Sequence, residues 1–491
     1  MGKLTVFRGK ERFDLTFEGQ PTVHSLLEQA GLAHPRPCGG GGRCGKCALR
    51  LEGAISPPDE REIFHGARLS CRARLLGNAT AWLNSFSLAQ IESAPLSDLP
   101  PLQPMAGALG MAVDIGTTTV ISRLYDLRSG RLLAQAQGEN PQSRISSDVM
   151  GRISAAEAGD LSRLQEQILR CLEEQQNRCL ALAGLQQRAE SLVLTGNTTM
   201  LYLLTGRDPK CLARLPFQAD CLFDLELPFG SAMAYLPPCI SAFVGADISC
   251  ALLAAGLCEK QETALFCDIG TNGEIALWRD GMLYVTATAA GPAFEGAGIS
   301  CGCGSIPGAV CAVAVEQGEM RITTISDAPP VGLCGSGLLD ALAIALSLGK
   351  IDETGAFTEG CEALPLCPDV VLQQEDIRAA QLAKAAIAAG IDTLLDHADL
   401  QPEQIDRFYI SGGFGSRLNI NSAVAIGLFP KALADRVEIL GNAALSGACQ
   451  TLLQGKSREK LRAIVQKAKA INLAADPRFN ERYIEQMYFP L

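Results

Sequence analysis

Cys38, Cys44 and Cys47 lie in the glycine-rich stretch RPCGGGGRCGKC. Together with Cys71 they give the spacing C-x5-C-x2-C-x23-C. This spacing is close to the plant-type C-x4-C-x2-C…C pattern, in which four thiolates hold an iron–sulfur cluster. Glycines suit such a loop, because they allow sharp turns and let backbone N–H groups approach the sulfurs. We therefore expect these four cysteines to bind a 2Fe–2S cluster.

Other roles for these cysteines remain open from the spacing alone. Three thiols on one loop leave an odd one if a disulfide forms, and a tight loop strains a bridge. A zinc site more often pairs two C-x2-C clips, and only one is present. Incidental burial in a core is the remaining alternative. A second group of cysteines has poor spacing for one centre, so we interpret them as core residues or spare thiols and leave a second metal site open: Cys301, Cys303, Cys311 and Cys334.

The segments around the cysteine loop predict how it is positioned. Thr22 is a plausible N-cap and Gly31 a plausible stop for a helix with apolar residues on one face. The expected order is two strands, this helix, the cysteine loop and a further strand, in KLTVFRG, RFDLTFEG, TVHSLLEQAGL and KCALRLEGAIS. Residues 1–85 resemble a 2Fe–2S ferredoxin in this order, which implies a β-grasp domain.

A second motif occurs twice in the remainder of the chain. An apolar strand ends in Asp-Ile-Gly-Thr at Asp114 and again at Asp268, and two further strands follow each time. Such a turn offers backbone N–H groups and hydroxyls to phosphate oxygens, and its carboxylate can hold Mg²⁺ directly or through water. Two facing turns would bind a nucleoside triphosphate, here ATP, from both sides. The expected contacts are Gly116, Thr117, Thr118, Thr119, Gly270, Thr271, Asn272 and Gly273.

Further glycine turns precede predicted helices. In RFYISGGFGSRLN, Gly412, Gly413 and Gly415 would let the backbone approach a base or ribose without Cβ interference. In VGLCGSGLL, Gly335 and Ser336 open a helix, whose N-terminus favours anions. Each turn by itself is equally compatible with an ordinary strand-to-helix connection.

The two Asp-Ile-Gly-Thr turns and the Gly-Gly turn resemble the acetate and sugar kinase, Hsp70 and actin (ASKHA) superfamily. A narrower resemblance is to the reductive activators of corrinoid proteins, which join a 2Fe–2S ferredoxin domain to an ATPase. It rests on ENPQSRISSDVMGRI, LTGNTTMLYLLTG, AFVGADISCALLAAG, CDIGTNGEIAL, GPAFEGAGISCG, ISGGFGSRLNINSAVAIGLFP and LGNAALSGA. Because this chain is shorter than the longer family members, we expect it to lack their extra middle domain.

The resemblance implies an α/β protein with three parts. Residues 1–85 would form the ferredoxin-like domain. Residues 86–108 are rich in proline and lack Lys and Arg, which is typical of an extended linker. Residues 109–491 would form a two-lobed, ribonuclease-H-like ASKHA ATPase domain of two duplicated halves.

The implied function is ATP-dependent reduction of an inactive Co(II) corrinoid to Co(I), with the electron passing through the 2Fe–2S cluster. The implied partners are the corrinoid protein of a methyltransferase system and a low-potential electron donor, a ferredoxin or reductase; a homodimer is left open. Asp114 and Asp268 would organise Mg²⁺ and phosphates, and Glu274 would position the attacking water. Asp247 is a weaker candidate for metal or water.

Two other functions fit the same motifs. One is a small-molecule kinase of this superfamily that a ferredoxin domain regulates. The other is a redox-sensing nucleotide switch. ATP turnover that requires a corrinoid protein, without a phosphorylated small molecule, would separate the first function from both.

The composition of the chain indicates its possible partners and its cellular location. A formal charge of −11 argues against nucleic acid as a partner, although residues 1–85 are net basic. The N-terminus lacks the apolar region of a signal peptide, and no apolar run reaches the roughly 18 residues of a membrane span. We therefore expect a cytoplasmic protein of an anaerobic cell, where thiols stay reduced.

Overall fold

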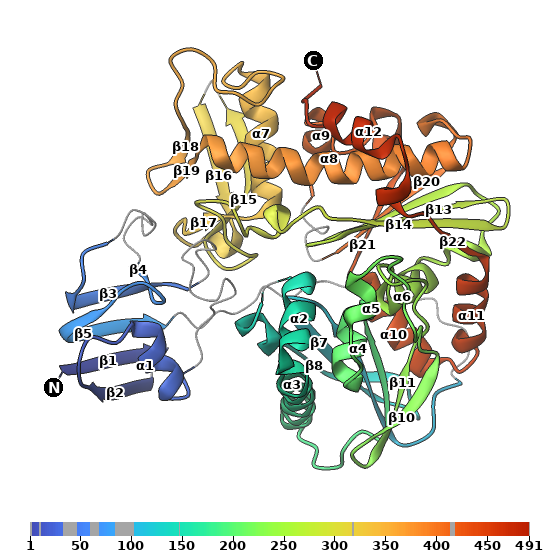
Figure 1. Cartoon of the computed structure of the whole chain (residues 1–491), viewed down its shortest axis with the longest axis horizontal. Coiled ribbons are helices and arrows are strands. Elements are labelled where there is room, and N and C mark those ends of the chain that lie inside the picture. Colours follow the sequence, from blue (N-terminus) through green and yellow to red (C-terminus); the bar gives the residue numbers. More distant parts are fainter. Residues whose placement is uncertain are drawn as a thin grey trace. The chain divides into compact units, whose positions relative to one another are not determined.

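A computed structural model describes the chain over residues 2–8, 11–32, 47–58, 68–83, 103–146, 148–316, 319–412 and 418–490 (Figure 1). The packing divides the chain into two units. One comprises residues 1–89, 143–146 and 292–380, and the other comprises residues 90–142, 147–291 and 381–491. Among the helices in the described ranges, none combines the length and the apolar character that crossing a bilayer requires.

The N-terminal part of the first unit is a five-stranded sheet with one helix, in the order β2-β1-β5-β3-β4. Its elements are β1 (Gly2–Arg8), β2 (Glu11–Phe17), α1 (Val23–Gln29), β3 (Ala48–Ile55), β4 (Arg68–Leu69) and β5 (Leu75–Leu83). The helix begins as predicted, because the Thr22 side chain accepts a hydrogen bond from the Ser25 N–H. Apolar side chains of α1 pack with those of the sheet, and the β-grasp prediction is confirmed.

The second unit contains two six-stranded sheets with the same inner connectivity. In each, three antiparallel strands form a meander, and two parallel strands continue the sheet beside the first strand. The first sheet has the order β10-β11-β9-β6-β7-β8, with β6 (Leu109–Ile115), β7 (Thr119–Asp126), β8 (Arg131–Glu139), β9 (Ser191–Gly196), β10 (Leu225–Phe229) and β11 (Ala232–Leu236).

The second sheet repeats this plan. Its order is β21-β20-β12-β13-β14-β22, with β12 (Ala264–Ile269), β13 (Gly273–Arg279), β14 (Met282–Thr288), β20 (Arg407–Ser411), β21 (Val437–Gly441) and β22 (Ala468–Ala470). The prediction of a duplicated, ribonuclease-H-like fold is thereby confirmed. Each Asp-Ile-Gly-Thr motif lies where the first strand of its meander ends.

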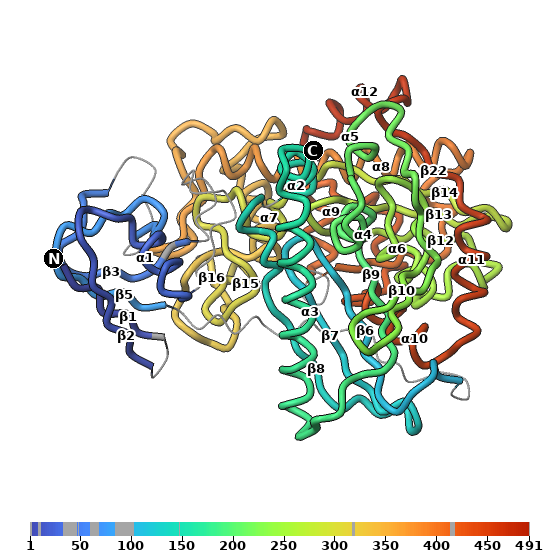
Figure 2. Tube along the Cα trace, turned by 60° about the horizontal axis from the view of Figure 1, so that its bottom comes forward, coloured from blue at the N-terminus to red at the C-terminus, as the bar shows by residue number. Residues whose placement is uncertain are grey.

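Helices cover both sheets. The helices of the first half are α2 (Val149–Ala155), α3 (Leu161–Ala183), α4 (Thr198–Thr205), α5 (Lys210–Ala213) and α6 (Ala246–Ala255). Helix α3 lies along β7 and β8, as Figures 1 and 2 show. Those of the second half are α8 (Gln374–His397), α9 (Ile420–Ala425), α10 (Ala443–Leu453), α11 (Ser457–Lys467) and α12 (Phe479–Glu485).

Helices α6 and α10 join the two halves through one hydrophobic core. This core combines their apolar side chains with residues from both sheets, among them Ala112 of β6 and Phe266 of β12. Close approach of the helices depends on Gly447, because a Cβ there would lie 1.9 Å from the carbonyl oxygen of Cys250. One shared core therefore holds the two sheets together.

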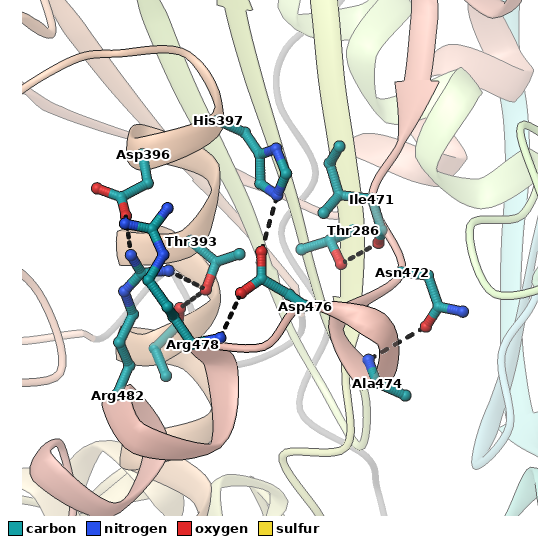
Figure 3. Close-up of polar contacts among 11 residues, drawn as sticks. Thr286, Thr393, Asp396, His397, Ile471, Asn472, Ala474, Asp476, Arg478 and Arg482 are labelled. Atoms are coloured by element: carbon teal, nitrogen blue, oxygen red, sulfur yellow. Dashed lines mark hydrogen bonds and ion pairs between the residues drawn. The ribbon is translucent and has the colours of Figure 1, made fainter.

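The C-terminal segment is attached to the end of α8 (Figure 3). His397 Nε2 lies 2.9 Å from Asp476 Oδ2, and Arg482 forms an ion pair with Asp396. Arg482 Nη1 also donates to Thr393 Oγ1 at 3.2 Å. These contacts fix α12 on a helix that is itself part of the second half.

The first unit also contains a smaller α/β region. It comprises β15 (Ala309–Glu316), β16 (Glu319–Thr324), β17 (Gly332–Leu333), α7 (Gly335–Ser347), β18 (Leu364–Cys367) and β19 (Val370–Leu372). Cys311 and Cys334 are buried there in a small core, against which Cys303 packs. This location agrees with the interpretation of these cysteines as core residues.

Candidate nucleotide and cluster sites

Asp114 and Asp268 occupy equivalent positions in the two halves. Each is the second-last residue of its strand, β6 or β12. The neighbouring parallel strand places Thr195 opposite Asp114 and Ser411 opposite Asp268. The duplicated motif is therefore presented at matching strand ends.

Both motifs continue into a tight turn closed by a backbone hydrogen bond. The Gly116 N–H donates to the Thr119 carbonyl at 3.0 Å, and the Gly270 N–H donates to the Asn272 carbonyl at 3.1 Å. A Cβ at Gly116 would lie 2.7 Å from the Thr119 carbonyl oxygen, so this position requires glycine. The same two segments contain the other predicted contacts Thr117, Thr118, Thr271 and Gly273.

Asn140 and Arg152 donate hydrogen bonds to the carbonyl groups of the first turn. Asn140 Nδ2 donates to the Gly116 carbonyl at 2.9 Å, and the Asn140 N–H donates to the Thr118 carbonyl at 2.8 Å. Arg152 Nη2 donates to the Thr117 carbonyl at 2.5 Å. In a trans peptide the N–H points opposite to the C=O, so these bonds turn the following N–H groups away from Asn140 and Arg152. That orientation suits an anion-binding turn.

Four carboxyl groups of the second unit share one electrostatic environment. Burial raises the pKa of Asp114 to about 6, the Asn442 hydrogen bond opposes this shift, and the charge of Asp268 adds to it. Burial and then the charge of Asp114 raise the pKa of Asp247 to about 8. Burial, followed by Asp247 and Asp268, holds the pKa of Glu274 well above its usual range. Carboxyl groups that raise one another's pKa in this way favour binding of a proton or a cation.

The glycine turns predicted elsewhere have different outcomes. Gly412 follows β20 with φ of 112°, and a Cβ there would lie 2.5 Å from the Ile269 carbonyl oxygen at the end of β12. Gly413 and Gly415 lie outside the described residues. Gly335 and Ser336 belong to the other unit, where both are buried at the start of α7.

The Ser336 side chain has a structural partner within that unit. Its hydroxyl donates to the Cys311 carbonyl at 2.8 Å and so connects α7 to β15. A role for Gly335 and Ser336 in nucleotide binding stays a prediction.

The described part of the cysteine motif fits a metal–sulfur site. Cys47 Sγ and Cys71 Sγ lie 3.1 Å apart, both residues are buried, and neither is in a disulfide. Leu69 completes a small apolar environment around them. Cys38 and Cys44 lie outside the described residues. Two convergent buried thiols are the donor type that an iron–sulfur cluster requires.

The acid site fits Mg²⁺ that is held mainly by other ligands. Within the described ranges, His, Cys, Asp and Glu side chains form no group of three or more that could hold a metal ion. Mg²⁺ usually keeps several waters and takes one or two carboxylates together with substrate phosphates. Asp114 and Asp268 are suited to that role beside a bound nucleotide.

Three contributors to the nucleotide site had no predicted role. Asn140 and Arg152 support the first turn, and Asn442 donates to Asp114. All three stand in motifs that carry the family resemblance, but their contacts depend on which segments meet in space. A weak local signal existed for Asn442, because an Asn directly after a strand and before an apolar helix is typical of an N-cap.

Comparison with known proteins gives a consistent result. A corrinoid activation enzyme, RamQ of Eubacterium limosum, is 34% identical over 418 residues, which cover 77% of this chain and 70% of the relative. This chain belongs to the family of reductive activators of corrinoid proteins. A second relative of the family, the [Co(II) methylated amine-specific corrinoid protein] reductase of Methanosarcina barkeri, is 29% identical over 311 residues, 58% of this chain and 57% of the relative.

A solved structure of the same family supports this membership over the whole length. A protein described as "Reductive activator for corrinoid,iron-sulfur protein" matches with a TM-score of 0.74 and 27% identity, over 99% of this chain and 98% of the other.

Three family descriptions divide the chain. Residues 9–76 match the 2Fe-2S iron-sulfur cluster binding domain, residues 109–260 the RACo middle region, and residues 262–491 the C-terminal domain of RACo, the ASKHA domain. The expectation that this reductive activator lacks a middle region is therefore wrong. Residues 109–260 are that region and form the first of the two similar sheets. The family assigns a 2Fe–2S cluster and ATP with Mg²⁺ as cofactors.

Proposed function

We propose that this protein uses ATP to reduce the Co(II) corrinoid of a partner methyltransferase protein to Co(I). The observation that supports this most directly is the presence on one chain of a buried thiol pair in a ferredoxin domain and a duplicated acidic nucleotide site. The named activities of the two relatives, corrinoid activation and reduction of a Co(II) corrinoid protein, point to the same substrate.

The energetics explain why both parts are needed. A bound 2Fe–2S cluster supplies one-electron transfer, at about −400 mV for plant-type clusters. A one-electron step becomes tenfold less favourable for every ~59 mV by which the acceptor is harder to reduce. Formation of Co(I) from such a donor is uphill, so the nucleotide site must contribute free energy. The donor that reloads the ferredoxin domain is a low-potential ferredoxin or reductase.

We assign roles in the nucleotide site by position. Asp114 and Asp268 organise Mg²⁺ and the phosphates, while the N–H groups of the two turns bind phosphate oxygens. The glycine turn at Gly412 approaches the nucleoside. Glu274 positions the attacking water, and Asp247 helps to hold metal or water beside it; burial and neighbouring carboxylates raise the pKa of both groups.

The decisive experiment combines purified protein, a Co(II) corrinoid protein, ATP and a low-potential reductant under anaerobic conditions. The cobalt spectrum should change to that of Co(I) only when ATP is present, and phosphate release should depend on the corrinoid protein. The Asp268→Ala variant is the control, because it should leave the ferredoxin domain able to accept electrons. A phosphorylated small molecule, or cobalt reduction at the same rate without ATP, would overturn the proposal.

A further inference from the structure

We propose that Asn442 is a positioning residue that fixes Asp114 from the opposite half of the nucleotide site and thereby prepares it for Mg²⁺–nucleotide. The inference rests on the nucleotide-dependent part of the proposed function. It assigns a task to a side chain for which neither the motifs nor the comparisons provide one.

Both ends of the Asn442 amide are engaged. Asn442 Oδ1 accepts from the Leu445 N–H at 2.7 Å and so caps α10, while Nδ2 donates to Asp114 Oδ2 at 2.8 Å. Because a backbone N–H can only donate, it fixes the oxygen of the amide and directs the NH₂ group to the carboxylate. Asn442 is 7% exposed, so water competes little for these bonds.

The bond connects the two duplicated halves. Asn442 follows β21 in the second half, whereas Asp114 ends β6 in the first half. Helix α10, which Asn442 begins, contacts the backbone of α6 at Gly447 and Cys250. Helix α6 carries Asp247 in its first turn. The hydrogen bond between Asn442 and Asp114 therefore depends on the position of the second half relative to the first.

The hydrogen bond from Asn442 matters because of the charge near Asp114. Asp114 shares the site with the like charge of Asp268, which disfavours a fixed, ionised carboxylate. A hydrogen bond from a neutral amide satisfies one carboxylate oxygen without adding charge. A carboxylate held in this way needs no reorientation when a hydrated Mg²⁺ arrives with the nucleotide.

The N-cap role and the positioning role can be separated by substitution. Asn442→Ser keeps a good helix cap, but its hydroxyl is too short to cap α10 and contact Asp114 together. Asn442→Asp keeps the helix cap and the shape of the side chain, but it replaces the NH₂ donor that contacts Asp114 with an acceptor oxygen. Asn419→Ser is the matched control, because Asn419 caps α9 through the Asn421 and Ser422 N–H groups at an exposed position.

The test measures nucleotide affinity by calorimetry with and without Mg²⁺, together with ATP turnover and the midpoint of thermal unfolding. In Asn442→Ser, the factor by which Mg²⁺ tightens nucleotide binding should fall about tenfold, which corresponds to ~1.4 kcal/mol. Metal-free binding and the unfolding midpoint should match those of Asn419→Ser. In Asn442→Asp the loss should be larger, because two acceptors then face each other.

Three results would overturn the inference. They are an unchanged Mg²⁺ effect in Asn442→Ser, an equal loss of affinity with and without Mg²⁺ accompanied by a lower unfolding midpoint, and wild-type nucleotide binding that Mg²⁺ does not affect. Wild-type protein that binds Mg²⁺–nucleotide but fails to reduce a Co(II) corrinoid protein would instead refute the proposed function, and the binding data would still decide the role of Asn442.

Discussion

Buried carboxyl groups with a raised pKa are a cost to the folded chain, and here three such groups are each affected by the charge of Asp268. Burial is the largest influence on Asp114, Asp247 and Glu274, and their mutual charges add to it. Such an arrangement is destabilising until a cation or a proton arrives. We interpret this arrangement as a site for Mg²⁺–nucleotide.

Removing either motif aspartate should stop ATP turnover and leave the cluster domain intact. We expect Asp114→Ala and Asp268→Ala each to lower kcat at least a hundredfold, because each removes a carboxylate proposed to organise Mg²⁺. The visible spectrum of the 2Fe–2S cluster should be unchanged, since its cysteines belong to another domain. Normal hydrolysis by both variants would contradict the proposed pair of phosphate-binding turns.

The nucleotide-free protein should become less stable as the pH rises from about 4 to 8. Burial raises the pKa of Asp247 from 3.8 to about 8, so the folded chain binds more protons than the unfolded chain in this window, and unfolding becomes easier as pH increases. Asp247→Asn should flatten this slope and add at least ~1.4 kcal/mol at pH 8, the equivalent of one pKa unit. Thermal unfolding midpoints at pH 5, 6.5 and 8 measure the effect.

Asp208→Asn is the control for this slope. Asp208 is an exposed carboxylate whose pKa the Lys210 side chain lowers, so its removal should not stabilise the protein at pH 8. If Asp247→Asn follows the same pH slope as the wild type, the carboxyl of Asp247 is not held protonated in the folded chain.

At the scale of elements, the sequence predicts local order well and contacts between distant segments poorly. The two three-strand meanders follow from apolar runs and glycine-containing turns, and they occur where expected. The joining of β9 to β6 and of β20 to β12 has no local signal, because parallel neighbours are far apart in sequence.

The same reason limits prediction of the site. Asp114 and Asp268 were identified by a repeated motif, whereas Asn442 becomes part of the site only when the second half packs beside the first. Arg152 is similar, since its contact with the Thr117 carbonyl depends on how α2 lies behind the turn. Long-range packing, which spacing does not encode, assembled these contacts.

Helix crossing at Gly447 offers a test of how the two halves are joined. Gly447→Ala would place a Cβ 1.9 Å from the Cys250 carbonyl oxygen, so α10 and α6 must separate. We expect a loss of about 2–3 kcal/mol of stability, typical of overpacking, and weaker nucleotide binding, because both helices carry site residues. Urea unfolding and calorimetry measure the two effects.

Gly455→Ala is the matched control for the helix crossing. A Cβ there would lie 3.4 Å from the Gln103 carbonyl oxygen, which is close to ordinary contact. Its effect should stay within about 0.5 kcal/mol, as for most surface substitutions. Equal effects of the two substitutions would show that the close approach of α10 to α6 does not limit stability.

At the scale of the whole molecule, the proposed function requires the ferredoxin domain to meet two partners. In the proposed function it would receive an electron from a donor and pass it to cobalt on a corrinoid protein, so the same small domain would make both contacts in turn. The proline-rich residues 86–102 precede residues 103–105, whose backbone is hydrogen-bonded to the end of α10 through Gln103 and Met105. The predicted linker therefore has an anchor on the ATPase side.

Cutting the chain within residues 89–100 tests whether this linker acts as a tether. At ~3.1 Å per residue, residues 86–102 would span roughly 50 Å if extended, enough to supply a high effective concentration of the ferredoxin domain near a bound corrinoid protein. ATP binding and corrinoid-protein binding should remain with residues 103–491. Cobalt reduction by the two fragments at low micromolar concentration should be at least tenfold slower than by the intact chain, and it should become sensitive to salt, because the net basic ferredoxin part would then find an acidic partner by diffusion.

Raising the concentration of the free ferredoxin fragment should restore the rate, which distinguishes a lost tether from a damaged domain. Fragments that match the intact chain at low micromolar concentration would show that covalent linkage contributes nothing to electron delivery.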